Sequence, residues 1–111
     1  GLELGGVPLA VMLGQVTGLP TLFVRKQAKE YGTRRLAEGG EVAGRRLLVV
    51  EDVVTSDGQV VLSTRDLKER GASVTHALCV IDREAGGAQA LAAEGVELRA
   101  LFSMSELKAA G

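Results

Sequence analysis

This sequence has little net charge and few aromatic residues, and both absences narrow its possible functions. Its 13 basic residues are balanced by 14 acidic ones, so that the formal net charge at pH 7 is -1. Nucleic-acid binding as the main activity requires a basic face that attracts the phosphate backbone, so we expect no nucleic-acid partner. Aromatic residues make up 3% of the chain, so its hydrophobic core must be aliphatic.

Long apolar runs and paired cysteines are also missing. No apolar stretch approaches the roughly 18 residues of a membrane span, and the first residues do not resemble a signal peptide, so we expect no membrane partner. Cys79 is the only cysteine, and a lone cysteine in an apolar run is usually a small core residue. We therefore expect a cytoplasmic protein.

Predicted helices and strands alternate along the chain. Helices are expected at residues 7–18, 59–70 and 86–95, with a short terminal helix capped by Ser103 or Ser105. Strands are expected at residues 19–25, 46–52, 73–83 and 96–103. The charged, glycine-punctuated segment 26–44 is predicted to be a long exposed loop. This alternation predicts one α/β domain with a mostly parallel central sheet flanked by helices, and the unbroken apolar run before Glu51 predicts a strand buried on both faces.

Charged residues end three of the predicted strands, namely Arg25, the pair Glu51 and Asp52, and Arg83. In parallel sheets, ligands bind beyond the carboxyl ends of the strands. These four residues are therefore expected on one rim. Arg83 could instead pair with Glu84 or Asp82, and its position alone favours that structural role.

The stretch VVEDVVTSDGQ, residues 49–59, combines a strand, a turn of small residues and a helix start. Backbone N–H groups and hydroxyls in such a turn can cradle a phosphate at the positive end of the helix. The two carboxylates suit sugar hydroxyls or a nearby Mg²⁺. An ordinary turn with Thr55 or Asp57 as the helix cap explains the same pattern equally well.

A basic segment, RKQAKEYGTRR at residues 25–35, precedes this motif. A mobile basic loop can close over a polyanionic substrate and exclude water. A solvated charged loop is the ordinary alternative.

Together these motifs resemble a known family. VVEDVVTSDGQ is similar to the phosphoribosyl pyrophosphate (PRPP) binding motif of type I phosphoribosyltransferases. GLELGGVPLA, LFVRKQAKEYGTRRLAEG, KERGA and VIDREAGG resemble orotate phosphoribosyltransferases in the same order and spacing. The resemblance covers nearly all of residues 1–111, which read as the core domain without the family's N-terminal hood and first core strand.

The resemblance implies a transferase that converts orotate and PRPP into orotidine 5′-monophosphate and pyrophosphate. The reaction uses Mg²⁺ and belongs to de novo pyrimidine biosynthesis. The family implies a homodimer in which Lys26 reaches the neighbouring subunit's site. The alternatives are a phosphoribosyltransferase-like nucleotide-binding or regulatory protein without turnover, and a phosphoribosyltransferase for another base.

The resemblance also implies roles for individual residues. Lys29 and Asp52 would be catalytic, and Leu4, Gly5 and Gly6 would form the pyrophosphate loop. Arg83 and Thr55 would contact orotate. The residues implied in PRPP binding are Arg25, Lys26, Lys29, Tyr31, Glu51, Asp52, Val53, Val54, Thr55, Ser56, Asp57, Gly58 and Gln59. Mg²⁺ would bind with PRPP, close to Glu51 and Asp52, with no certain protein ligand.

Two departures from the family pattern stand out. Asp57 and Gln59 occupy positions where small residues are usual, and the N-terminal portion is missing. A chain of these 111 residues alone is therefore expected to turn over poorly, either as part of a longer protein or as a truncated relative.

Asp57 leads to a direct prediction. Aspartate can adopt the left-handed backbone that glycine takes, but two unit charges about 4 Å apart repel by about 4 kcal/mol at an effective dielectric of about 20. We therefore expect Asp57→Gly to lower the Michaelis constant for PRPP, measured by initial rates. An unchanged constant would contradict the prediction.

Overall fold

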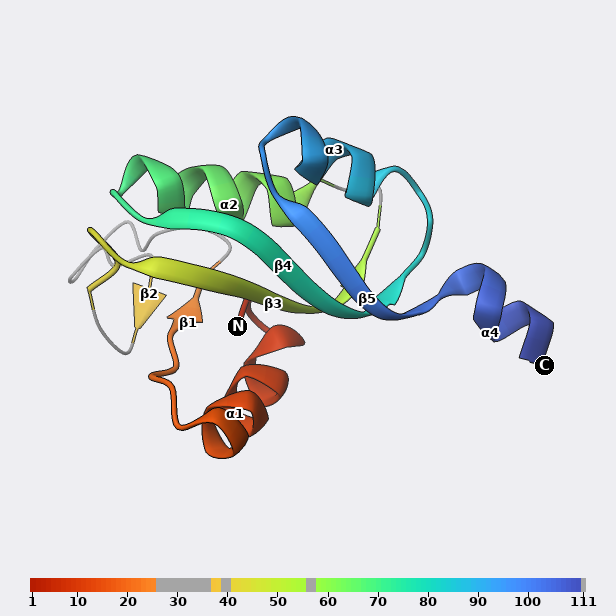
Figure 1. Ribbon diagram of the computed structural model, residues 1–111, viewed down its shortest axis with the longest axis horizontal. Coiled ribbons are helices and arrows are strands. Elements are labelled where there is room, and N and C mark those ends of the chain that lie inside the picture. The colour runs from red at the N-terminus through yellow and green to blue at the C-terminus, as the bar shows by residue number, and fades with distance from the viewer. Residues whose placement is uncertain (26–36, 39–40, 56–57, 111) are drawn as a thin grey trace.

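The fold was analysed in a computed structural model that describes residues 1–25, 37–38, 41–55 and 58–110. Helices and strands alternate along most of the chain (Figure 1). The helices are α1 (Gly6–Thr17), α2 (Gln59–Glu69), α3 (Gly87–Ala93) and α4 (Met104–Ala110). The strands are β1 (Phe23–Val24), β2 (Ala37–Glu38), β3 (Arg46–Val54), β4 (Ser73–Asp82) and β5 (Glu97–Ser103). The predicted α/β class is confirmed.

A three-stranded parallel sheet, in the order β3-β4-β5, forms the centre of the structure. The first residues of the chain extend it beyond β3. Leu2 N donates to Val50 O over 3.0 Å, and Glu3 N donates to Val24 O over 2.8 Å. Residues 1–3 therefore lie between β3 and β1, which pairs with β2 in the antiparallel sense. This arrangement brings the start of the chain next to the middle of β3.

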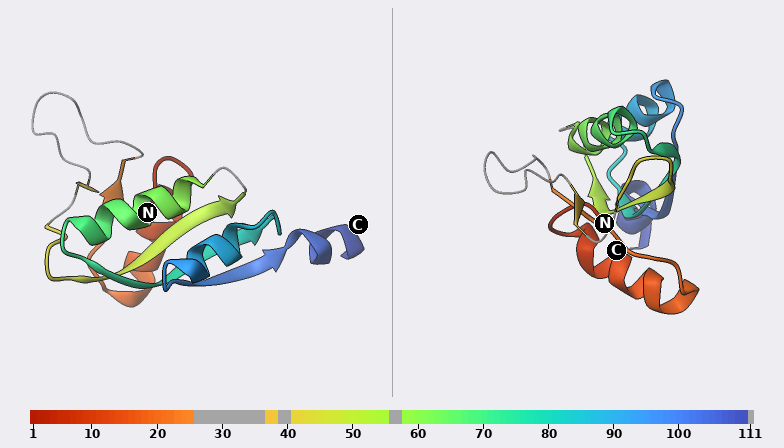
Figure 2. Two further views of the ribbon diagram at one scale, coloured as in Figure 1. Left: turned by 90° about the horizontal axis from the view of Figure 1, so that it is seen from above. Right: turned by 90° about the vertical axis from the view of Figure 1, so that its left-hand side faces the viewer.

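Helices cover both faces of the sheet. Helices α2 and α3 lie on one face and α1 lies on the other (Figures 1 and 2). Helix α1 carries Pro8 in its first turn, where proline is tolerated, and ends at Gly18, whose φ of 73° is left-handed. None of the helices in the described part of the chain is long and apolar enough to cross a membrane.

The core between the sheet and helices α2 and α3 is aliphatic, as the scarcity of aromatic residues predicts. Leu67, Leu91 and Val96 are each at most 1% exposed. Cys79 is buried beside them and has no disulfide partner, which confirms the prediction of a core residue. Burial raises the pKa of its thiol to about 11, because a low-dielectric environment disfavours the charged thiolate.

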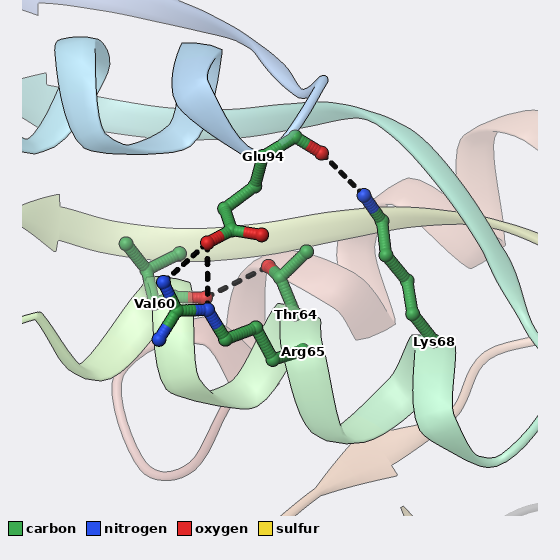
Figure 3. A network of polar contacts seen from close by, with 5 residues as sticks. All are labelled: Val60, Thr64, Arg65, Lys68 and Glu94. Carbon is green, nitrogen blue, oxygen red and sulfur yellow. Dashed lines mark hydrogen bonds and ion pairs between the residues drawn. The ribbon is translucent and has the colours of Figure 1, made fainter.

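Polar contacts join α2 to the turn after α3 (Figure 3). The guanidinium of Arg65 pairs with the carboxylate of Glu94, and the ammonium of Lys68 donates to the Glu94 carbonyl. The hydrogen bond from Arg65 lowers the pKa of Glu94. Thr64, which is fully buried, donates to Val60 O over 2.7 Å. The contacts of Arg65 and Lys68 with Glu94 thus link α2 to α3 above the sheet, and the Thr64 bond lies within α2.

Several sequence-based expectations need correction. Strand β3 continues to Val54, so Glu51 and Asp52 lie inside the strand and not at its end. The strand is not buried throughout, because Leu48 is 52% exposed. The segment 26–44 contains β2, a strand that its polar sequence did not indicate. The predicted strand at 19–25 is reduced to Phe23–Val24.

Leu91 provides a test of the core. It is 0% exposed, and truncation of a buried leucine loses transfer free energy and leaves a cavity. We expect Leu91→Ala to lower the free energy of unfolding by about 2–5 kcal/mol in urea titrations. Leu62→Ala is the matched control, because Leu62 on α2 is 52% exposed; equal losses in the two variants would contradict this description of the core.

Candidate functional site

A polar pocket of about 250 Å³ lies near the carboxyl end of β3. It is lined by residues 3–5 from the first loop, 51–55 from β3, and 59–60 from the start of α2. The first loop therefore meets two neighbouring segments that lie far from it in the sequence. This is the end of a parallel strand, where α/β proteins bind ligands.

The glycines of the first loop allow it to press against β3. A Cβ atom at Gly5 would lie 2.0 Å from Asp52 Oδ2, and one at Gly6 would lie 2.3 Å from Val50 O. Both separations are far below van der Waals contact. Gly6 therefore requires glycine, because its obstacle is backbone, whereas a side chain at Gly5 would displace the Asp52 carboxylate. The predicted loop Leu4–Gly6 and the acidic pair are thus brought together, although Gly6 itself is buried in the first turn of α1 and does not line the pocket.

Glu51 and Asp52 both contribute to the pocket. Asp52 is exposed and Glu51 is half-buried. Each carboxylate accepts a backbone N–H from the next residue, Asp52 N to Glu51 Oε1 over 3.0 Å and Val53 N to Asp52 Oδ1 over 2.8 Å. Ionised carboxylates are pure acceptors. The pair therefore suits a ligand that donates hydroxyl groups or carries positive charge.

The amino end of α2 borders the same pocket. Its cap residue is Gly58, whose φ of 79° is left-handed. Thr55 is therefore not the cap residue, and the alternative with Asp57 falls outside the described residues. The first N–H groups of a helix have no partner within the helix and attract anions, so the geometry supports a phosphate beside Thr55 and Gln59.

Arg83 approaches this region through its backbone. Arg83 N donates to Val54 O over 3.1 Å. A Cβ atom at Gly87 would lie 2.4 Å from Val54 Cγ1 and 3.0 Å from Thr55 O, so the loop after β4 packs tightly against the end of β3. No ion pair joins Arg83 to Asp82 or Glu84 in the described part of the chain. Its exposed side chain does not line the pocket.

Other predicted site residues are not brought into the pocket. Arg25 follows β1 and is half-buried, and it lies outside the pocket lining. The predictions for Lys26, Lys29, Tyr31, Ser56 and Asp57 fall outside the described residues. A larger cavity of about 500 Å³ lies at the other end of β3, between α1 and residues 45–50. Its lining is mostly apolar, so it lacks the groups that the predicted chemistry needs.

Glu3 is a pocket residue that our reading of the sequence missed. Its position directly before the Leu-Gly-Gly loop was the available signal. Among the residues that the structure describes, no group of three or more His, Cys, Asp or Glu side chains could hold a metal ion. Any divalent cation here would need oxygen ligands from the substrate or water in addition to Glu51 or Asp52.

Known proteins are similar to this chain over nearly its whole length. No family model matches the sequence. A curated orotate phosphoribosyltransferase from a Nocardioides species is 53% identical over 110 residues, which cover 99% of this chain and 62% of that protein. The chain therefore spans about three fifths of this curated relative.

Solved structures agree with the sequence comparison. The crystal structure of orotate phosphoribosyltransferase from Aeropyrum pernix matches with a TM-score of 0.87 and 33% identity, over 100% of this chain and 63% of that one. The Mycobacterium tuberculosis H37Rv enzyme in complex with PRPP matches with a TM-score of 0.80 and 36% identity, over 96% of this chain and 62% of that one.

Gly6 tests the contact between the first loop and β3. An alanine there would clash with a backbone oxygen of β3. The structural shifts needed to accommodate such an extra group typically destabilise a protein by about 1–3 kcal/mol. We expect Gly6→Ala to lower the free energy of unfolding by that amount in urea titrations. Val11→Ala, at a 41% exposed position of the same helix, should cost less; a Gly6→Ala protein as stable as wild type would disprove the contact.

Proposed function

We infer that this chain, which belongs with the orotate phosphoribosyltransferases in sequence and in fold, carries the core of an enzyme that transfers phosphoribose to orotate. The reaction joins orotate to PRPP and releases pyrophosphate, and its product is orotidine 5′-monophosphate, in the de novo pathway to UMP. The observation that supports this proposal most is the polar pocket formed by the glycine loop, the acidic pair and the amino end of α2.

Each part of PRPP finds a suitable partner in this arrangement. The ribose hydroxyls would donate to the carboxylates of Glu51 and Asp52, which are acceptors. The 5-phosphate would lie at the amino end of α2, beside residues 55–59. The pyrophosphate would lie along the Leu4–Gly6 loop, where glycines let backbone N–H groups approach closely.

The proposed chemistry is electrostatic. As the bond to pyrophosphate breaks, the ribose becomes cationic, and Asp52 and Glu51 stabilise positive charge beside it. Lys29 and Arg25 would neutralise the charge that grows on the leaving pyrophosphate. Mg²⁺, held by the substrate's oxygens near Glu51 and Asp52, would supply further neutralisation when bound.

Orotate carries a carboxylate and carbonyl groups, for which Arg83 is a fitting partner. A guanidinium can bind a planar carboxylate with two parallel hydrogen bonds. The backbone hydrogen bond from Arg83 to Val54 keeps this arginine beside the end of β3. Thr55, half-buried in the pocket lining, would also contact the base.

The assembly and location are proposed from the same resemblance. The segment RKQAKEYGT resembles the family loop whose lysine, here Lys26, acts across a homodimer interface. We propose a cytoplasmic homodimer on that ground. A nucleotide-binding protein without turnover is the second candidate, because Asp57 puts a negative charge into the segment proposed to hold the 5-phosphate.

Pyrophosphate release tests the function. Protein, PRPP, Mg²⁺ and one base at a time are mixed, and release is expected with orotate only. Asp52→Asn should lower kcat/KM by about 10- to 100-fold, the range for a lost hydrogen bond to a charged group. Asp66→Asn on α2 is the matched control and should leave the rate unchanged. Binding of PRPP without release would favour the second candidate, and release with another base would contradict the assignment of orotate.

A further inference from the structure

The residue after Arg83 has an unusual backbone conformation. Glu84 has a φ of 59°. Among the residues that the structure describes, it is the only non-glycine with a positive φ. A side chain in this region is disfavoured by contact between its Cβ atom and the backbone. Surrounding contacts must therefore hold Glu84 in place.

Three hydrogen bonds hold this turn, one made by Arg83 and two by Glu84. Glu84 N donates to Asp82 Oδ1 over 2.9 Å, and Arg83 N donates to Val54 O over 3.1 Å. The carboxylate of Glu84 accepts the backbone N–H of Ser105 over 2.7 Å. The last bond joins residues that are 21 positions apart, so it links the turn to a different element of the fold.

That element is α4, which has little other support. No residue of α4 is buried, and the helix projects beyond the end of the sheet where β5 finishes (Figure 1). Its first turn is formed locally, because Ser103 Oγ accepts Glu106 N over 3.2 Å and donates to Glu106 Oε1 over 3.0 Å. The predicted cap at Ser103 is thereby confirmed. A preformed turn offers the Ser105 N–H as a fixed donor to Glu84.

The contact with Ser105 favours the ionised form of the Glu84 carboxyl group. The hydrogen bond from Ser105 lowers the pKa of the Glu84 carboxyl, with a smaller contribution from the positive charge of Lys108. The acceptor is therefore ionised at neutral pH. Hydrogen bonds to an ionised acceptor are stronger than neutral ones.

We propose that Glu84 is a positioning residue for Arg83. Its carboxylate, bound to the first turn of α4, keeps the left-handed turn that sets the Arg83 backbone against Val54 at the edge of the pocket. This inference deepens the proposed function, on which it rests for the role of Arg83 toward orotate. Glu84 itself touches no substrate in this scheme.

Variants at Glu84 separate the carboxylate from the backbone conformation. Glu84→Gly removes the carboxylate, and glycine leaves the left-handed region as readily as it adopts it, so the variant loses what holds the turn without adding strain. Glu84→Gln keeps an oxygen that can accept the Ser105 N–H. Glu97→Gln is the matched control, because Glu97 is an exposed acid at the opposite end of β5. All variants are made in the full-length protein, and thermal unfolding checks that each one folds.

Amide hydrogen exchange measures the positioning directly. In Glu84→Gly we expect exchange at both Ser105 and Arg83 to accelerate about 3- to 10-fold, the size of one lost hydrogen bond. Glu84→Gln should show a smaller change, and Glu97→Gln none. Unchanged exchange at Arg83 in Glu84→Gly would overturn the proposal, whether or not the protein is active.

Steady-state kinetics provides the second measurement. Glu84→Gly should raise the KM for orotate about 3- to 10-fold, while the KM for PRPP stays within about twofold of wild type. Equal increases in both constants, or none for orotate, would overturn the positioning role. A wild-type protein that releases no pyrophosphate with orotate would refute the proposed function instead, and the exchange result would still decide whether Glu84 positions Arg83.

Discussion

The close approach of the first loop to β3 is the contact on which the rest of the site depends. Gly6 lies so near the Val50 backbone that no side chain fits there, and a side chain at Gly5 would displace the Asp52 carboxylate. Because α1 begins at Gly6, this contact also fixes where that helix crosses the sheet. Residues 1–3 are at the same time bonded to β1 and β3. One steric requirement thus joins the acidic pair, the loop and the helix that covers the other face of the sheet.

The parallel sheet gives this contact its functional setting. Strands β3 and β4 run in the same direction, so their carboxyl ends and the turns that follow them lie on one side of the molecule. The pocket therefore collects acidic groups, hydroxyl groups and backbone donors from different elements. No single sequence motif contains them all. The pocket is small and polar, while the larger cavity at the other end of β3 is mostly apolar. The polar lining of the smaller pocket, and not its volume, therefore identifies it as the candidate site.

The sequence predicted those helix ends that are marked by a few neighbouring residues. Gly18 ended α1, and Ser103 with Glu106 began α4, because such caps depend on a few neighbouring residues. Strand β2 was missed because it is defined by pairing with β1 and not by its own composition. The extension of β3 to Val54 was missed for a similar reason: charged residues occupy a strand whose pairing with β4 continues past them.

The candidate site could likewise be predicted only in part from the sequence. The acidic pair and the glycine loop could be recognised as motifs, but their contact could not, since it depends on distances across the fold. Gly58 as the cap of α2 and Glu3 in the pocket also required the folded backbone. Lys26, Lys29 and Asp57 stay predictions, because they fall outside the described residues.

The order of the elements has a consequence for how the protein folds. Strands β3, β4 and β5 and the helices between them follow one another in the sequence, so each pairing closes a short loop. Leu2 reaches Val50 only across nearly half of the chain, and closure of longer loops costs more entropy and is slower. The acidic pair is expected to be in place on a formed sheet before the glycine loop arrives. The pocket would then be among the last parts of the native structure to be completed.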